Sequence, residues 1–257
     1  MIELWIALAG CVLVMLALWC WQIFSRRADW ADFAWAALIG AQAIAFAAVG
    51  TGSAEKRALA VLLAATWSFR LSRHLGARLA AGHDEDGRYQ AMRRHFGERQ
   101  HAWLLAFFLA QALAAWLFAL PAWVVANDAS ARLDAWVIAG VAVWFLSLAG
   151  ESIADRQLAA FRSDPANRGR VCRAGLWRYS RHPNYFFEWL HWFSYPLVAL
   201  GAPHQWLAWS GPVLMLVFLY RVSGIPYTEK QSLASRGDAY REYQRTTSAF
   251  FPWPPKD

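Results

Sequence analysis

One stretch of the chain, residues 175–188, gathers side chains that could do chemistry. It reads GLWRYSRHPNYFFE and places Arg178, Arg181 and His182 shortly before Pro183. Proline suits the first turn of a helix and not its interior, so we predict a helix that begins near Pro183. The N-terminal end of a helix carries partial positive charge and free N–H groups. With these cationic side chains beside it, this end of the helix favours a phosphate-bearing ligand at a membrane surface.

The same predicted helix also contains the first of three candidate proton donors. Asn184 and Glu188 are four residues apart and so share one helix face. An ionisable group within an apolar helix is costly and usually has a role, and a buried carboxyl can act as a general acid near neutral pH. Glu188 is therefore the first candidate for the acid, with Asp32 and Tyr89 as weaker ones. The alternative is that such groups are surface residues at helix ends, and His191 is interpreted as a hydrogen-bonded core histidine.

A second cluster precedes the central stretch. Asp155 and Arg162 are seven residues apart, hence on one face of a helix, and Arg170 follows. A carboxylate and several arginines facing one cavity suit a nucleotide, because the acid accepts hydrogen bonds from hydroxyls and arginine forks bind phosphates. The alternative is a charged amphipathic helix lying on the membrane. A third segment, residues 86–89, is either a lid or a solvated loop.

Composition places these residues in a membrane protein. The 257 residues are 58% hydrophobic, contain 17 Trp and are only 17% charged. Several apolar runs reach the roughly 20 residues needed to span a bilayer as a helix. The net charge of +7 is assigned to cytoplasmic loops, so we expect no nucleic-acid partner. The three cysteines form no disulfide framework, no metal-type Cys/His spacing occurs, and the first apolar run is expected to be retained.

The predicted fold is an all-α bundle of about seven transmembrane helices forming a single domain over residues 1–257. Arg and Lys concentrate after the first, third, fifth and seventh spans. Because cytoplasmic loops are the Arg/Lys-rich ones, we expect the N-terminus outside and the C-terminus in the cytoplasm. The spans are predicted at about 4–24, 30–49, 58–79, 102–125, 135–150, 184–201 and 206–220, with an amphipathic segment at 151–162 and a polar helix at about 228–244.

The central stretch, together with residues 151–158, closely resembles the DUF1295 family of bacterial membrane proteins, relatives of the steroid 5-alpha-reductases and sterol reductases. The resemblance extends to Asp86–Tyr89, to Ser223–Pro226 and to the C-terminal tyrosines, and it is most specific from Glu151 to Glu188. It implies seven helices in the inner membrane and an NADPH pocket on the cytoplasmic side, with 151–257 as the cofactor-binding half.

The resemblance also implies roles for individual residues. Glu188 matches an acidic residue that in sterol C14 reductases is an Asp proposed as proton donor, and Glu151 stands where steroid reductases have Asn. Phe187 departs from the family pattern, which has Gly before the acid, and the third span lacks the Tyr that steroid reductases use on the substrate carbonyl. The cofactor-binding residues implied are Glu151, Asp155, Arg162, Arg170, Arg178, Tyr179, Arg181, His182, Asn184, Tyr185 and Arg221.

Three functions follow from these patterns. The first is NADPH-dependent reduction of an activated C=C bond in a steroid-like or other lipid enone taken from the bilayer. The second is an S-adenosylmethionine-dependent methyltransferase, because RHPxY also occurs in isoprenylcysteine and phospholipid methyltransferases. The third is a non-catalytic lipid-binding protein. Asp155 with Gln157-Leu158, and Asn184 followed by Glu188, favour the reductase.

Overall fold

The computed structural model describes residues 1–82, 84–131, 133–222 and 224–256, and every regular element within them is a helix. The predicted all-α class is thus confirmed for these residues. Ser223, part of the segment Ser223–Pro226 named above, lies outside them. By its contacts the chain divides into two compact units, residues 1–132 with 201–210 and residues 133–200 with 211–257.

Long apolar helices identify an integral membrane protein. Among the described residues, five segments are long and apolar enough to cross a membrane: Ile2–Ser25, Trp30–Val49, Gly87–Ala126, Ala135–Ser163 and Gln205–Arg236. The predicted span 58–79 is helical but is not among them, because Arg70, Arg73 and Arg78 make it too polar. The predicted span 184–201 is likewise not among them, because this range is divided into shorter helices.

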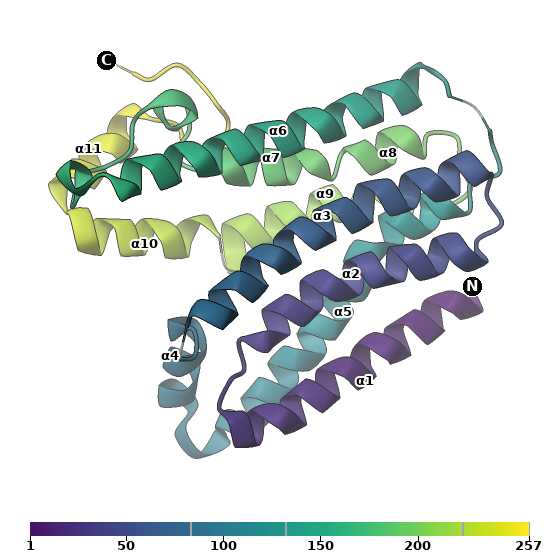
Figure 1. Ribbon diagram of the computed structural model, residues 1–257, viewed down its shortest axis with the longest axis horizontal. Helices are drawn as coiled ribbons and strands as arrows, with labels where there is room; N and C mark the ends of the chain where they lie inside the picture. The colour runs from purple at the N-terminus through teal and green to yellow at the C-terminus, as the bar shows by residue number, and fades with distance from the viewer. Residues whose placement is uncertain (83, 132, 223, 257) are drawn as a thin grey trace. The chain divides into compact units, whose positions relative to one another are not determined.

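The first unit is built from long helices. Helix α2 lies against α3 and α5, and α1 lies against α5 (Figure 1). Small residues such as Ala36, Ala60 and Ala115 are fully buried, so that the backbones approach closely. Its helices are α1 (Ile2–Ser25), α2 (Trp30–Val49), α3 (Ala54–Ala81), α4 (Gly87–Phe96), η1 (Gly97–Arg99), α5 (Gln100–Ala126) and η4 (Gln205–Trp209).

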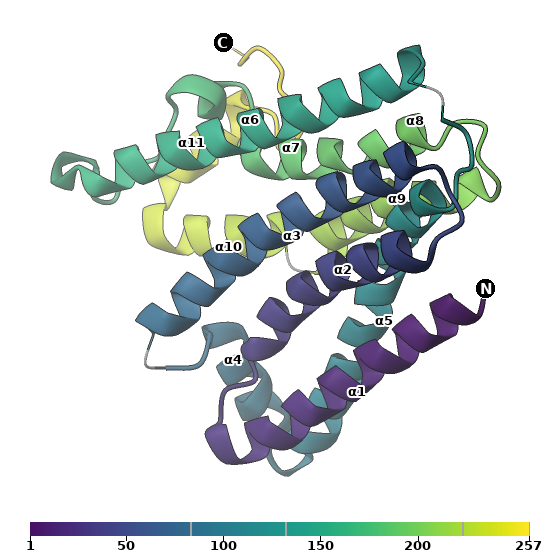
Figure 2. The ribbon, with the colours of Figure 1, turned by 45° about the vertical axis from the view of Figure 1, so that its right-hand side comes forward.

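The second unit is organised along one long helix, α6, which packs against α7 and α8 (Figure 2). The prediction ended the span at residue 150, whereas the helix continues without interruption through the polar segment to Ser163. The elements of this unit are α6 (Ala135–Ser163), η2 (Pro165–Asn167), η3 (Gly175–Arg178), α7 (Pro183–His191), α8 (Ser194–Val198), α9 (Ser210–Val217), η5 (Phe218–Val222), α10 (Ile225–Arg236) and α11 (Asp238–Thr246).

Two predicted helices are each divided by an identifiable residue. Helix α7 begins at Pro183, as predicted, but ends at His191, and α8 starts at Ser194. Pro196 explains the break, because a proline cannot donate to the carbonyl four residues earlier and its ring clashes there. The polar tail helix is interrupted at Gly237, whose positive φ of 53° is readily adopted only by glycine.

A buried ion pair closes one end of the first unit. Lys56 Nζ lies 2.8 Å from Asp128 Oδ2, with side-chain exposures of 3% and 4%. The same turns are joined by backbone hydrogen bonds from Gly52 to Ala126 and from Ser53 to Asp128. Burial raises the pKa of Asp128, but hydrogen bonds from Lys56 and Ser130 outweigh it and hold that pKa below its ordinary value of 3.8.

Substituting Asp128→Asn should leave the Lys56 ammonium buried without a counter-charge, which costs about 3–5 kcal/mol. Because the folded-state pKa of Asp128 is depressed, the pair stabilises the fold above pH 3.8 and the effect is lost as pH falls further. Thermal unfolding in detergent should therefore separate wild type and variant widely near neutral pH and less in acid. The exposed Glu55→Gln serves as control; a gap independent of pH would contradict the assignment.

Candidate functional site

The central stretch is fixed to α6 by two hydrogen bonds. The indole of Trp177 donates to the carbonyl of Ala154 at 2.9 Å, and Leu176 N–H donates to the side chain of Gln157 at 2.9 Å. Short helix η3 is thereby held on α6, and the chain turns from it into α7. The residues before Pro183 consequently lie beside the polar part of α6.

The predicted partners Asp155 and Asn184 come together in this arrangement. Asn184 Nδ2 donates to Asp155 Oδ1 at 3.1 Å, and its carbonyl oxygen accepts from Tyr185 N–H at 3.0 Å. The second bond fixes which way the amide points. Asp155 remains exposed and Asn184 partly so, and the pair is therefore accessible to a ligand.

The predicted arginines Arg162 and Arg170 line one hollow of about 340 Å³ at the end of α6. Arg168 and Arg236 also line it, and Asp164 is its acidic residue. The sequence analysis did not identify Arg236, since it lies on α10, far from the motif in the chain. Exposed guanidinium groups around a hollow can replace their hydrogen bonds to water with hydrogen bonds to phosphate oxygens. The hollow is thus suited to an anion.

Arg181 and His182 have a different environment. Arg181 Nε donates to Glu229 Oε1 at 2.7 Å, and its Nη1 donates to the carbonyls of Gln244 and Thr247 at 3.0 and 2.5 Å. His182 Nε2 lies 3.3 Å from the same Glu229 oxygen. Both side chains are buried and hold the C-terminal helices to the central stretch. Glu229 was missed because nothing local distinguishes it within a polar tail.

The remaining predicted cofactor residues border this core. Tyr185 stacks on His182 with ring centroids 5.4 Å apart, and its hydroxyl lies 3.4 Å from that of Thr228. The carbonyl of Tyr179 accepts from Trp253 N–H at 2.9 Å. Three other side chains predicted to meet the cofactor are exposed: Arg178, Tyr179 and Arg221.

Glu188 is partly buried on α7, where the indole of Trp192 lies 3.4 Å from its Oε1 and donates to it. Its neighbour Phe187 faces Gly150 of α6, and a Cβ placed on Gly150 would lie 2.4 Å from the Phe187 ring. A glycine on α6 thus accommodates the ring that replaces the glycine of the family pattern on α7. Glu151, next to Gly150, is 9% exposed.

Asp32 and Tyr89, both in the first unit, are brought together there. Tyr89 is 2% exposed and its hydroxyl donates to Asp32 Oδ1 at 2.8 Å. Gln111, which the sequence analysis overlooked although it interrupts an apolar run, donates to the same oxygen at 3.0 Å. Arg88 Nη2 donates to Asp32 Oδ2 at 2.7 Å. Residues 86–89 are thus an anchored part of the fold and not a solvated loop.

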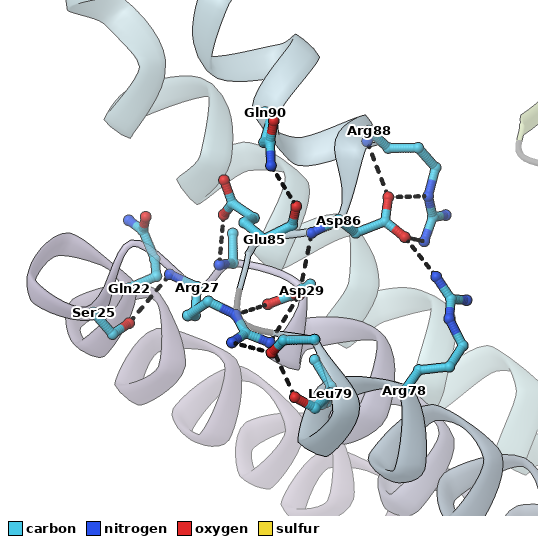
Figure 3. Close-up of polar contacts among 12 residues, drawn as sticks. Gln22, Ser25, Arg27, Asp29, Arg78, Leu79, Glu85, Asp86, Arg88 and Gln90 are labelled. Atoms are coloured by element: carbon cyan, nitrogen blue, oxygen red, sulfur yellow. Dashed lines mark hydrogen bonds and ion pairs between the residues drawn. The ribbon is translucent and has the colours of Figure 1, made fainter.

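Ion pairs continue this network toward the surface (Figure 3). Asp86 accepts from Arg88 and from Arg78, the latter at 2.9 Å. Burial raises the pKa of Asp86, but hydrogen bonds from Arg88 and the charges of both arginines hold it below its ordinary value. Asp86 N–H also donates to Asp29, which pairs with Arg27. Among the described residues, no three His, Cys, Asp or Glu side chains gather in a way that could hold a metal ion.

Substituting Glu229→Gln should destabilise the second unit by about 1.5–3 kcal/mol, because Arg181 loses a charged hydrogen-bond partner. Thermal unfolding and limited proteolysis of the C-terminal helices measure the effect. The matched control is Glu242→Gln on α11, whose pair with Arg245 is exposed and contributes little. Equal behaviour of the two variants would show that Glu229 does not anchor these helices.

Substituting Gly150→Ala should lower the unfolding temperature, because the new methyl group overlaps the Phe187 ring. Overpacking of this kind costs about 1–3 kcal/mol. In the double variant Gly150→Ala with Phe187→Ala, the overlap is removed, and the loss should be smaller than the sum of the single losses. Strict additivity of the unfolding free energies would mean that these residues do not accommodate one another.

Comparison with known proteins places the chain in a family. The family model described as protein of unknown function (DUF1295) matches residues 18–247. The Schizosaccharomyces pombe protein named uncharacterized protein C594.04c is 26% identical over 268 residues, which cover 91% of this chain and 75% of the relative. On the extent of the family match, the chain belongs to the DUF1295 family.

Proposed function

We propose that this protein is an NADPH-dependent membrane reductase of an activated C=C bond in a steroid-like or other lipid enone, related to the steroid 5-alpha-reductases. One observation carries the proposal: the arginine-lined hollow and the Asp155–Asn184 pair lie along the same helix, α6. Arg162 and Asp155 are separated by about 10 Å along its axis at 1.5 Å per residue. An extended dinucleotide can reach across this distance.

The charge of the hollow favours NADPH over S-adenosylmethionine. Its lining contains the arginines 162, 168, 170 and 236 against a single carboxylate, Asp164. Arginine forks recognise phosphate oxygens, whereas the sulfonium of S-adenosylmethionine is positive and the molecule carries no phosphate. The arginines therefore match the phosphates of NADPH, and S-adenosylmethionine itself offers them no anionic group.

In this proposal Arg162 and Arg170 hold phosphates, and Asn184 and Tyr185 lie beside the nicotinamide. Bound NADPH would supply the hydride, while the protein orients the reactants and excludes water. Arg178, Tyr179 and Arg221 are exposed, so their side chains can contact the bound cofactor from the solvent side. Arg181 and His182, which pair with Glu229, contribute by holding this region in place.

A proton must reach the carbon next to the one that accepts hydride, or the carbonyl conjugated to it. Glu188 remains the first candidate, because Trp192 orients its carboxyl group from one turn further along the chain. Asp32 and Tyr89 form the other candidate pair, in which the Tyr89 hydroxyl is the donor and Asp32 and Gln111 fix it. The two candidates can be separated by mutation.

We further propose seven spans in a bacterial inner membrane, with the N-terminus outside and this site in the cytoplasm. Helix α3, 28 residues long, is long enough to serve as a span, with its arginines extending toward the headgroups at one end. The interrupted pair α7 and α8 provides the other additional span. The bilayer then supplies the hydrophobic substrate.

The cofactor can be tested by thermal unfolding of the detergent-purified protein. We expect NADPH at 100 times its dissociation constant to stabilise the protein by about 2.7 kcal/mol. S-adenosylmethionine should leave the transition unchanged. Stabilisation by S-adenosylmethionine alone would overturn the reductase assignment in favour of the methyltransferase, and stabilisation by neither would favour a non-catalytic lipid-binding protein.

Variants on α6 and α7 locate the cofactor. Asn184→Ala and Arg162→Ala should each weaken NADPH binding about tenfold or more, since each removes hydrogen bonds worth about 1.5 kcal/mol. Arg156→Ala is the control, because its guanidinium donates back to Ser152 on its own helix. Glu188→Gln should keep NADPH affinity but slow enone reduction; if it turns over normally while Tyr89→Phe does not, the acid is Tyr89.

A further inference from the structure

Two hollows of different chemical character adjoin at the end of α6. The first, of about 340 Å³, is the arginine-lined one. The second, of about 530 Å³, is lined along α10 by hydroxyl and amide side chains, including Thr228, Gln231, Ser232 and Ser235. Arg162 and Arg236 border both. A cationic compartment therefore adjoins one that shares two of its arginines and is otherwise lined by uncharged side chains of α10.

Arg236 is held at the junction by its own contacts. Its Nε donates to the carbonyl of Arg170 at 2.9 Å, and its Nη1 donates to Ser235 Oγ at 3.2 Å. The first bond joins the end of α10 to the loop that follows α6, and the second holds the guanidinium against its own helix. Because this guanidinium is already positioned, little side-chain entropy is lost when it meets an anion.

The cationic compartment holds more charge than a diphosphate needs. Four arginines and one aspartate give a formal charge of +3 (4 − 1). A dinucleotide's diphosphate supplies about −2, one charge per phosphate diester. A phosphate monoester adds about −1.5 to −2 at pH 7. A ligand that carries both matches the compartment better than one with the diphosphate alone.

We infer that this pair of hollows binds the adenosine half of the dinucleotide, with its phosphates among the arginines and its nucleoside against α10. Arg236 contacts the phosphate monoester on the ribose and so selects the phosphorylated cofactor over its unphosphorylated form. Ser232 and Gln231 face the sugar and base, to which a hydroxyl and an amide can both donate and accept. The inference rests on the proposed function and adds α10, which no motif marks, to the cofactor site.

Fragments without nicotinamide test this site by itself. Isothermal titration of the full chain in detergent with adenosine 2′,5′-bisphosphate, 5′-ADP and adenosine should give affinities in that order, with the bisphosphate at least tenfold tighter than 5′-ADP. Arg236→Gln should remove most of that preference while changing 5′-ADP affinity less. Arg241→Gln, an exposed arginine on α11 paired with Asp238, should behave as wild type.

A second variant examines the nucleoside hollow independently of charge. Ser232→Leu narrows it and removes a hydroxyl group, and it should weaken both adenosine nucleotides about tenfold while leaving the affinity for inorganic pyrophosphate unchanged. Equal losses for pyrophosphate and nucleotides would overturn the division into two compartments.

The outcomes separate this inference from the proposed function. If NADPH and NADH bind wild type equally, or Arg236→Gln keeps the full preference for the bisphosphate, the inference is overturned while reduction can stand. If the fragments bind as expected but NADPH binds no better than adenosine 2′,5′-bisphosphate and no enone is reduced, the adenosine site stands and the reductase proposal is wrong.

Discussion

The continuity of α6 is the constraint on which the second unit depends. The helix carries an apolar stretch and a polar stretch without a break, so residues in both keep a fixed spacing of 1.5 Å along the axis. Gly150 receives Phe187, Ala154 and Gln157 hold η3, Asp155 meets Asn184, and Arg162 borders the hollow. A kink between residues 150 and 162 would separate the apolar end from the cationic one. A single continuous helix therefore fixes the spacing between the Asp155–Asn184 pair and the arginine-lined hollow.

The packing of Phe187 on Gly150 illustrates how a large ring is accommodated between α6 and α7. A large ring on α7 normally forces two helices apart, and the neighbouring Asn184 and Glu188 would move with it. Here Gly150 provides the space on the opposite helix, and the ring fills it. The two helices can approach closely because the small residue of this contact is Gly150 on α6. In the proposed mechanism, Phe187 consequently alters the shape of the pocket and not the spacing of α6 and α7.

Much of this arrangement could be predicted from the sequence, and what could not has physical causes. Pro183 fixes the start of α7 through its own geometry, and the seven-residue spacing of Asp155 and Arg162 fixes their common face. The end of α7 at His191 also has a local cause, Pro196. The sequence prediction extended this helix because the whole segment is hydrophobic. The partners of Arg181 and Tyr89 were not local at all. Glu229 and Gln111 are brought to them by the tertiary fold, and no spacing in the chain encodes those contacts.

The arginines of the second unit show why residue type alone could not assign roles. Arg181 is buried with Glu229 and two carbonyls, so binding a phosphate would require breaking a desolvated ion pair and leaving Glu229 uncompensated, a cost of several kcal/mol. Arg162, Arg168 and Arg170 are exposed, and a phosphate there replaces only water. Displacing water from an exposed arginine costs less free energy than breaking the buried Arg181–Glu229 pair. The arginines of this region therefore fall into two groups, those that maintain the fold and those that remain available to a ligand. The exposed arginines at the ends of α6 and α10 are therefore the ones available to the proposed ligand, and Arg181 and His182 maintain the fold through Glu229.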